Sequence, residues 1–403
     1  MTQRIAMTCN GPGEFAGWVR PLVQTLHTLA PELELHCFFV PDDYATGRES
    51  AVARESLPML TIHEPSDYLR FALGGSKQVG PCDIVLYLGG DVMHAARLHA
   101  RLGGDLCAYR YAPRSFARHV SHAFALDTPN AELLAKTIAR EHISITGNLA
   151  VDGAIAQAAQ PTQSTIADGI VFLPGSRRYE ITHLVPFFAT AASRLQRLRP
   201  GLPVSFGISP FTEIASIHQA LQGPTDARMY AKQGQVIDLA GQPAILMDES
   251  QTPIPIVQNA LATAVSSKLA ITIPGTKCIE LAALGVPTIA CVPFNIPEKV
   301  VMNGPLTYLD RLPGLGTPLK RAAVLAFARR FTYFTQPNMD AGALVLPELT
   351  GTLTPGVVAQ AALALFDQPE QRDQLQQHLR AIYQPHHGAT ERMANTLLEL
   401  LAR

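Results

Sequence analysis

The chain has 403 residues, of which 47% are hydrophobic and 16% charged, and its formal net charge is −1. This length exceeds what a single hydrophobic core supports, so we expect two domains. The near-zero charge excludes the broad basic surface typical of nucleic-acid-binding proteins. No apolar run reaches the ~18–20 residues that a membrane-spanning helix needs, and we expect no leader peptide ahead of the first strand. We therefore predict a cytoplasmic protein whose apolar excess is compatible with peripheral membrane contact.

The cysteines indicate a reducing compartment. None of the six lies in a Cys-x-x-Cys pair, and several fall inside apolar strand-like runs. This pattern is typical of buried free thiols rather than of disulfides or zinc ligands. We therefore expect no bound metal and no cofactor. The six residues are Cys9, Cys37, Cys82, Cys107, Cys278 and Cys291.

The first part of the chain alternates short apolar runs with helix-like stretches. Such alternation is typical of parallel sheets whose crossover connections are helices. The predicted strands are 4–8, 34–40, 83–88, 106–109, 122–126 and 142–146. The predicted helices are 18–29, 92–101 and 131–140.

A second α/β segment follows a polar stretch at 154–168, which predicts an interdomain linker. The predicted strands there are 169–173, 203–208, 244–247, 269–273 and 288–292, and the predicted helices are 179–197, 253–262 and 277–284. We therefore predict an α/β protein with two Rossmann-like, doubly wound domains that face a cleft, with ligands at the carboxyl ends of the strands. The domains are expected at 1–160 and 161–365, and the helices of 366–403 should pack back toward the first domain.

The turn after the first strand is rich in glycine. Gly11, Gly13 and Gly17 predict close backbone approach by an acceptor substrate or by the opposite domain. Glu14 lies in the same turn and is a candidate catalytic carboxylate. The turn is not a Gly-x-Gly-x-x-Gly motif with a later acidic partner, so NAD binding is not favoured. A tight structural loop is the alternative interpretation.

The segment 88–94 follows the strand predicted at 83–88. Asp91 would lie at a strand end, where a carboxylate can act as general base toward an acceptor hydroxyl. His94 lies one helical turn later and is the rival base. The alternative is that Asp91 only caps the next helix.

The segment 173–181, Leu-Pro-Gly-Ser-Arg-Arg-Tyr-Glu-Ile, connects a strand to a long helix. Gly175 permits a ligand to approach the backbone, and Ser176 can cap the helix. Free N–H groups would then face an anion, and Arg177 adds a planar cation suited to a diphosphate. An ordinary capped turn is the alternative.

A similar turn follows the strand predicted at 269–273. Gly275, Thr276 and Lys277 open a helix, and Glu280 lies one helical turn after Thr276 on the same face. A carboxylate there can accept hydrogen bonds from a ribose diol, as acidic residues do in other Rossmann sites. The alternative for Glu280 is a solvated helix position.

These motifs together resemble those of lipid-A-disaccharide synthases. That family's Leu-Pro-Gly-Ser-Arg-x-x-Glu-Ile is matched fully by 173–181. Four further motifs of the family match less closely. Its Gly-Glu-x-Ser-Gly-Asp resembles 13–18, and its Gly-Ile-Asp-Ala-Pro-Asp resembles 89–94. Its Ser-Gly-Thr-Ala-Thr-Leu-Glu resembles 274–280, and its later Pro-Asn pair resembles Pro337 and Asn338. The chain departs from the family at Ala16, Trp18, His94, Pro274, Lys277 and Cys278.

The resemblance implies a GT-B fold and an inverting, metal-independent glycosyltransferase. It implies that a UDP-sugar, of N-acetylglucosamine type, is the donor and that a lipid or lipid-phosphate sugar is the acceptor. Asp91 would be the base, Arg177 would contact the donor phosphates, Glu280 the ribose, and Asn338 would join the donor site. The protein is expected to be a monomer or homodimer.

Two other functions remain open. A UDP-sugar 2-epimerase shares the two-domain layout and needs no acceptor, and a non-catalytic nucleotide-sugar binder needs only the donor site. The segment 318–334, with Lys320, Arg321, Arg329 and Arg330 among apolar residues, predicts either a basic amphipathic helix at an anionic membrane or an ordinary surface helix. The segment 302–316 predicts a loop beside it.

Overall fold

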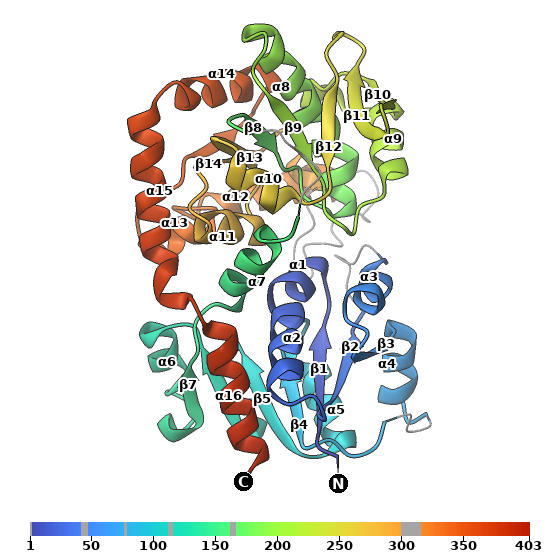
Figure 1. Ribbon diagram of the computed structural model, residues 1–403, viewed down its shortest axis with the longest axis vertical. Helices are drawn as coiled ribbons and strands as arrows, with labels where there is room; N and C mark the ends of the chain where they lie inside the picture. Colours follow the sequence, from blue (N-terminus) through green and yellow to red (C-terminus); the bar gives the residue numbers. More distant parts are fainter. Residues whose placement is uncertain (1, 42–46, 76–78, 112–115, 162–166, 300–315) are drawn as a thin grey trace. The chain divides into compact units, whose positions relative to one another are not determined.

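The computed structural model describes residues 2–41, 47–75, 79–111, 116–161, 167–299 and 316–403 (Figure 1). The chain divides into two compact units: unit 1 comprises 1–156 and 384–403, and unit 2 comprises 157–383. The borders therefore lie close to the expected position at the first crossing but not at the second. Helix α15 (Pro369–Tyr383) belongs to unit 2, and α16 (Ala389–Leu401) belongs to unit 1. The loop predicted at 302–316 lies, except for its last residue, outside the described residues.

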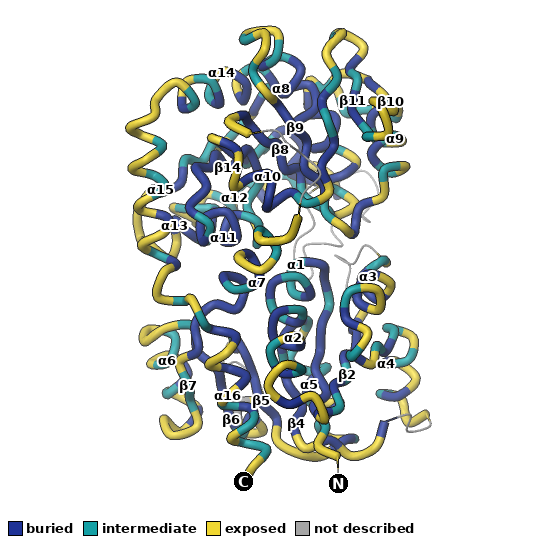
Figure 2. The backbone as a smooth tube through the Cα atoms, viewed as in Figure 1, coloured by how far each residue is buried: buried dark blue, intermediate teal, exposed yellow. Residues whose placement is uncertain are grey.

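Unit 1 is built on a parallel sheet of seven strands in the order β3-β2-β1-β4-β5-β6-β7. The strands are apolar and largely buried, as parallel strands covered on both faces must be (Figure 2). Their bounds are β1 (Arg4–Cys9), β2 (Glu34–Phe39), β3 (Leu60–His63), β4 (Ile84–Tyr87), β5 (Asp105–Tyr109), β6 (His122–Ala125) and β7 (Ile143–Ile145).

Helices cover the sheet of unit 1. One apolar cluster joins strand residues such as Ala6 and Val85 to residues of α4, α5 and α6, and α16 packs against α2. The helical bounds are α1 (Pro12–Glu14), a π-helical turn η1 (Phe15–Val19), α2 (Arg20–Leu29), α3 (Glu49–Ser56), α4 (Pro65–Ala72), α5 (Val92–Leu102), α6 (Thr128–Leu134) and α7 (Leu149–Ala158), with short turns η2 (Ala117–His119), η3 (Arg140–His142) and η8 (Gln384–His386).

Two histidines on neighbouring strands make unit 1 sensitive to acid. His36 Nδ1 lies 3.2 Å from His63 Nε2, and the His63 ring stacks on Phe38 with centroids 4.1 Å apart. Burial, with the positive charge of His36, lowers the pKa of His63 to about 4, while Asp67 opposes the shift. Burial also lowers the pKa of His36. Both folded-state pKa values lie below the unfolded value. The contribution of the two neutral histidines to the free energy of unfolding is therefore fully present above pH 6.5 and is lost as the pH falls toward 4.

We expect unit 1 to lose about 2–3 kcal/mol of stability from His63 alone between pH 7 and pH 4. The variant His63→Gln, which cannot take up the proton, should lose less over this range. Urea unfolding at several pH values, with His27→Gln on α2 as the control, measures the difference. An equal pH slope for wild type and His63→Gln would exclude this role.

Unit 2 is built on a sheet of eight strands in the order β10-β11-β12-β9-β8-β13-β14-β15. The pairs β10–β11 and β11–β12 are antiparallel, and all other neighbours are parallel. The bounds are β8 (Ile170–Phe172), β9 (Val204–Gly207), β10 (Gly234–Leu239), β11 (Gln242–Met247), β12 (Ile254–Val257), β13 (Leu269–Thr272), β14 (Thr288–Pro293) and β15 (Glu348–Gly351).

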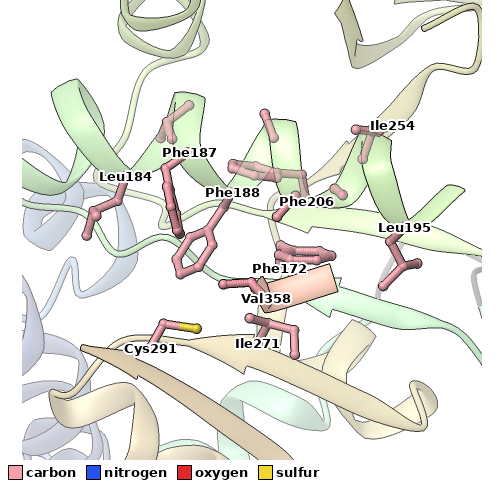
Figure 3. Packing of buried hydrophobic residues seen from close by; sticks show 14 of the residues in the cluster. Phe172, Leu184, Phe187, Phe188, Leu195, Phe206, Ile254, Ile271, Cys291 and Val358 are labelled. Atoms are coloured by element: carbon pink, nitrogen blue, oxygen red, sulfur yellow. The ribbon is translucent and has the colours of Figure 1, made fainter. Parts of the chain in front are cut away.

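The core of unit 2 joins this sheet to α8, α9 and α14, and its largest side chains are phenylalanines (Figure 3). Phe172 of β8 and Phe206 of β9 are fully buried with Phe187 and Phe188 of α8. The helical bounds are a π-helical turn η4 (Glu180–Leu184), α8 (Val185–Leu198), α9 (Ile214–Gln222), α10 (Ala260–Ser266), α11 (Thr276–Ala283), α12 (Gly316–Ala328), α13 (Gln336–Ala341) and α14 (Pro355–Phe366), with turns η5 (Ala227–Met229) and η6 (Pro297–Lys299).

The predicted α/β class with doubly wound parallel sheets is confirmed, and the differences are local. The predicted helix 253–262 is wrong in its first half, because Ile254–Val257 form strand β12 and α10 begins only at Ala260. Residues 254–257 pair with β9 and β11, so sheet contacts override the helix-like pattern. The strands β3, β10 and β15 and the helices α3, α4, α7, α9, α13 and α14 were not expected. The predicted linker 154–168 is wrong at its start, because α7 continues to Ala158. Within the described residues, no helix is both long and apolar enough to cross a membrane.

Candidate functional site

The motif-bearing strands flank the point in each sheet where the strand order reverses. In unit 1 this point lies between β1 and β4, and in unit 2 it lies between β8 and β13. Open α/β sheets bind their ligands outside the carboxyl ends of the strands at such switch points. The glycine-bearing turns follow these four strands directly, so each unit has its candidate residues where ligands bind in this class of sheet.

The turn after β8 differs from its prediction in one respect. Ser176 does not cap the helix, and its N–H group is not free to meet an anion. Glu180 Oε2 accepts hydrogen bonds from the N–H groups of Ser176, at 2.7 Å, and Arg177, at 2.8 Å. Gly175 has φ +97°, and a side chain there would collide with this carboxylate. The backbone donors that we predicted for a phosphate are therefore satisfied within the chain, and the contact of the half-exposed Arg177 side chain with a phosphate stays a prediction.

Removing Glu180 is expected to open an anion site. Glu180→Ala should destabilise unit 2 by about 2–3 kcal/mol, because two N–H groups at a helix start lose a charged acceptor. Sulfate should bind the vacated donors, so added sulfate should raise the melting temperature of the variant more than that of wild type. Sodium chloride at equal ionic strength is the control. An equal sulfate response in both proteins would contradict this assignment.

The turn after β13 carries the second pair of opposite charges. Lys277 Nζ lies 2.5 Å from Glu280 Oε2. The Glu280 side chain is 5% exposed and that of Lys277 33%, so the carboxylate is shielded and the ammonium is accessible. Gly275 has φ +154°, and a Cβ there would meet nothing within 4 Å. This turn therefore has open space above its glycine, unlike the turn after β8.

The two turns of unit 2 are copies of one pattern. Residues 173–181 read Leu-Pro-Gly-Ser-Arg-Arg-Tyr-Glu-Ile, and residues 273–281 read Ile-Pro-Gly-Thr-Lys-Cys-Ile-Glu-Leu. In each, a Pro-Gly pair precedes a hydroxyl residue, a cation and a glutamate three residues after the cation. The cation of each pair, Arg177 or Lys277, is the more exposed partner. The likeness of the two turns was expected from the sequence, and their residue-by-residue correspondence appears at a constant offset of 100 positions, 175 against 275.

The structure places the two turns side by side. Strands β8 and β13 are parallel neighbours, and Thr272 Oγ1 donates a 3.1 Å hydrogen bond to the carbonyl oxygen of Leu173. A Cβ on Gly175 would lie 3.1 Å from Ile273 Cδ1. Arg177 and Lys277 thus belong to adjacent turns at one edge of one sheet.

Asn338 has a structural role instead of the predicted donor contact. It is fully buried. Its amide nitrogen donates to the carbonyl of Leu346 and to Glu348, and its oxygen accepts from the N–H groups of Val345 and Leu346. All four hydrogen-bonding positions of the amide are used, which leaves none for a nucleotide.

The basic helix predicted at 318–334 has fewer exposed cations than expected. Lys320 is only 4% exposed, and Arg321 lies 3.4 Å from the buried Glu298. Arg329 and Arg330 are exposed and follow the end of α12. Large apolar side chains are exposed near both ends of α12: Leu319, at 49%, in its first turn, and Phe327 and Phe331, each at 41%, near the two arginines. The exposed groups at the end of α12 are therefore two phenylalanines and two arginines.

In unit 1, Asp91 caps helix α5. Its carboxylate accepts a 2.8 Å hydrogen bond from the N–H of Met93, and the residue is exposed. The capping interpretation is therefore correct. It does not exclude a second role, because a carboxylate has a further oxygen with lone pairs available to a ligand.

His94 is half-buried and forms a 2.6 Å hydrogen bond through Nδ1 to the hydroxyl of Tyr68. Burial lowers the pKa of His94, with Arg97 acting in the same direction and Asp91 against it. Arg97 is also a hydrogen-bond partner of Tyr68. Because arginine only donates, the Tyr68 oxygen is the acceptor toward Arg97 and its own proton is available for His94 Nδ1.

Glu14 lies against the turn that precedes Asp91. A Cβ on Gly89 would lie 3.1 Å from Glu14 Cγ, and a Cβ on Gly11 would lie 2.9 Å from Glu14 Oε2. Both Asp91 and Glu14 raise the pKa of Tyr87, which burial has already raised, to about 12. The turns after β1 and β4 are thus in contact, and they bring Glu14, Asp91 and Tyr87 together. Tyr87 was not identified from the sequence.

The glycines of the first turn serve packing at two of their three positions. Gly11 and Gly17 are buried, whereas Gly13 is half-buried. A Cβ on Gly153 of α7 would lie 3.4 Å from Gly17 Cα, so Gly17 permits close packing between helices. The predicted acceptor contact stays a prediction for Gly13, and the other two glycines are explained by contacts within unit 1.

Comparisons with known proteins reveal likeness of fold. No known family model matches the chain, and no curated protein sequence matches it. Solved structures do match along its whole length. The S. aureus MnaA–UDP co-structure has a TM-score of 0.58 at 15% identity, covering 100% of this chain and 98% of that chain. UDP-GlcNAc 2-epimerase from Neisseria meningitidis bound to UDP-GlcNAc has a TM-score of 0.58 at 13% identity, covering 98% and 100%. CalG4, the calicheamicin glycosyltransferase, has a TM-score of 0.50 at 13% identity, covering 100% and 99%.

These similarities establish the architecture. At 13–15% identity they show the fold alone. The expected GT-B type fold, with two Rossmann-like units, is confirmed. None of the matched structures reported above is a lipid-A-disaccharide synthase.

Proposed function

We propose that this protein is an enzyme that binds a UDP-sugar and inverts the configuration at C2 of a UDP-N-acetylhexosamine. The assignment of the donor site to unit 2 rests on the two similar turns at the β8/β13 switch point, each with an accessible cation. Two adjacent cations suit the two phosphates of a nucleoside diphosphate. The reaction type is supported by four matched structures, three of them 2-epimerases by name and one the MnaA–UDP co-structure, whose TM-scores of 0.57–0.58 exceed the 0.50 of CalG4.

The ion pairs suggest how the donor binds. Lys277 holds the shielded carboxylate of Glu280, so a phosphate that attracts Lys277 also releases Glu280. The freed carboxylate can then accept hydrogen bonds from the ribose hydroxyls. Arg177 can turn toward the second phosphate, while Glu180 keeps its backbone donors and preserves the turn. Diphosphate and ribose recognition are thereby coupled through one lysine.

We assign the proton transfers of the reaction to the carboxylates of unit 1. Because C2 is not adjacent to a carbonyl group, removal of its proton requires the C1–O bond to UDP to break in the same step, which leaves a C1=C2 double bond in the sugar. Return of a proton to the opposite face of C2, with UDP adding back at C1, then completes the inversion, so one group must remove a proton and one must return it. Asp91 is exposed at a strand end, and Glu14 lies against the same turn. His94 is the weaker candidate for the base, because its hydrogen bond with Tyr68 favours the tautomer with a proton on Nε2.

Incubation with UDP-N-acetylglucosamine alone in D₂O tests this function. A 2-epimerase should produce a second UDP-sugar and incorporate deuterium at C2, both visible by NMR. Binding of UDP without exchange or turnover would exclude epimerisation and leave a transferase or a non-catalytic binder. Absence of UDP binding by calorimetry would exclude all three.

Glycosyl transfer to a lipid or lipid-phosphate sugar is the second candidate function, and the exposed apolar surface at the end of α12 supports it. Phe327 and Phe331 beside Arg329 and Arg330 can contact an anionic lipid surface. Full identity with Leu-Pro-Gly-Ser-Arg-x-x-Glu-Ile favours the same function. Transfer of labelled sugar from UDP-N-acetylglucosamine to a lipid-phosphate acceptor, without C2 exchange in the acceptor's absence, would select it over epimerisation.

A further inference from the structure

Arg110 has a backbone conformation that its side chain disfavours. It directly follows β5 and has φ +50°, in the left-handed region that residues with a Cβ rarely adopt. Ala240, another such residue, lies in the two-residue turn of the β10–β11 hairpin, where this conformation is required. Arg110 directly follows a strand of a parallel sheet, so no hairpin turn explains its positive φ. Disfavoured backbone conformations gather at binding and catalytic sites.

The side chain of Arg110 packs on the ring of Trp18. Its guanidinium carbon lies 5.5 Å from the ring centroid of Trp18. Trp18 packs edge-on against Tyr109, with centroids 5.5 Å apart and an interplanar angle of 77°. A guanidinium stacked on an aromatic ring keeps its N–H edge available for hydrogen bonds. Across the described part of the chain, no carboxylate forms an ion pair with Arg110.

Arg110 also lies beside the groups proposed for the chemistry. Strands β4 and β5 are parallel neighbours, with Tyr87 paired to Ala108. The charges of Asp91, Glu14 and Arg110 all act on the Tyr87 hydroxyl, which donates a 2.8 Å hydrogen bond to the carbonyl oxygen of Gly90. A half-buried cation that forms no ion pair with a carboxylate of the described residues thus lies at the same sheet edge as Asp91 and Glu14.

From this geometry we infer that Arg110 is an anion-binding residue of unit 1 and that it holds a phosphate or carboxylate group of the substrate near Asp91. A planar guanidinium binds either group through two parallel hydrogen bonds. The anion can belong to the nucleotide sugar or to a second, phosphorylated sugar substrate. The inference rests on the proposed function for the identity of the substrate and on the Arg110 geometry for the anion.

Calorimetry on the full chain at fixed salt, with UDP and N-acetylglucosamine 1-phosphate as separate probes, tests this. The variant Arg110→Asn keeps the backbone, because asparagine tolerates the left-handed region, and its melting temperature should stay within ~2 °C of wild type. It should weaken binding of one probe at least ~10-fold, the expected effect of losing a charged hydrogen-bonding pair. Arg110→Lys should restore part of the affinity, and Arg70→Asn, at an exposed arginine of α4, should change nothing.

The two probes separate the sources of the anion. If Arg110→Asn loses affinity only for the sugar phosphate, Arg110 binds a second substrate. If the variant loses affinity for UDP, Arg110 binds the donor. Wild-type affinity of Arg110→Asn for both probes overturns the inference while leaving the proposed function intact. A wild-type protein that binds the sugar phosphate but not UDP overturns the proposed function and still tests Arg110. A wild type that binds neither probe overturns both.

Discussion

Replacing Asp91 by asparagine is expected to lower turnover by about 10²–10⁴-fold, the usual effect of removing a positioned general base. The fold should be unaffected, because asparagine caps helices as well as aspartate does and keeps an oxygen for the N–H of Met93. The affinity for UDP should stay within about twofold, since the nucleotide residues proposed here lie in unit 2. NMR assays of turnover and calorimetry with UDP measure the two quantities independently.

A matched control exists at Asp127. This exposed aspartate caps α6 by accepting a 2.7 Å hydrogen bond from the N–H of Asn130. Asp127→Asn makes the same chemical change at another helix start of unit 1 and should leave turnover unchanged. If Asp91→Asn retains turnover within fivefold of wild type, Asp91 is only a helix cap, and Glu14 becomes the carboxylate to test.

Replacing Asn338 by alanine is expected to destabilise unit 2 by roughly 3–5 kcal/mol, because it leaves several buried polar groups without partners. The N–H groups of Val345 and Leu346 would lose their acceptor, and Glu348 would lose one donor. Glu348 also accepts from the N–H groups of Phe334 and Thr335 at the start of α13, so the loss should spread along this segment. Urea unfolding of the full chain measures the change.

The affinity for UDP distinguishes this structural role from a donor contact. Below the unfolding range, Asn338→Ala should bind UDP as wild type does. Gln336→Ala on the same helix removes an exposed hydrogen bond to Asp340 and should change stability by less than about 0.5 kcal/mol. A large loss of UDP affinity with little loss of stability would instead return Asn338 to the donor site.

Local patterns in the sequence determined the elements that carry the candidate site. The apolar runs that became β1, β4, β8 and β13 are short, and each is followed within three residues by glycine, so the local sequence alone implies strand, turn and helix. The capping position of Asp91 was equally readable, because a helix cap depends on neighbouring residues only. The alternation of strands with helices was enough to imply parallel sheets and two units.

Strand order and burial could be decided only by the tertiary structure. The like segments 173–181 and 273–281 can act together only because β13 pairs with β8, on the side opposite β9. Local sequence does not specify which strand pairs with β8. Glu180 accepts the N–H groups of the β8 turn, and Asn338 donates to Glu348 of β15; only the folded chain displays these contacts. Arg110 carried no motif, since its distinguishing features are a backbone angle and a ring contact with a residue 92 positions earlier (110 − 18). Contacts between distant segments cost chain entropy and are set by global packing, which is why periodicity and motif spacing do not reveal them.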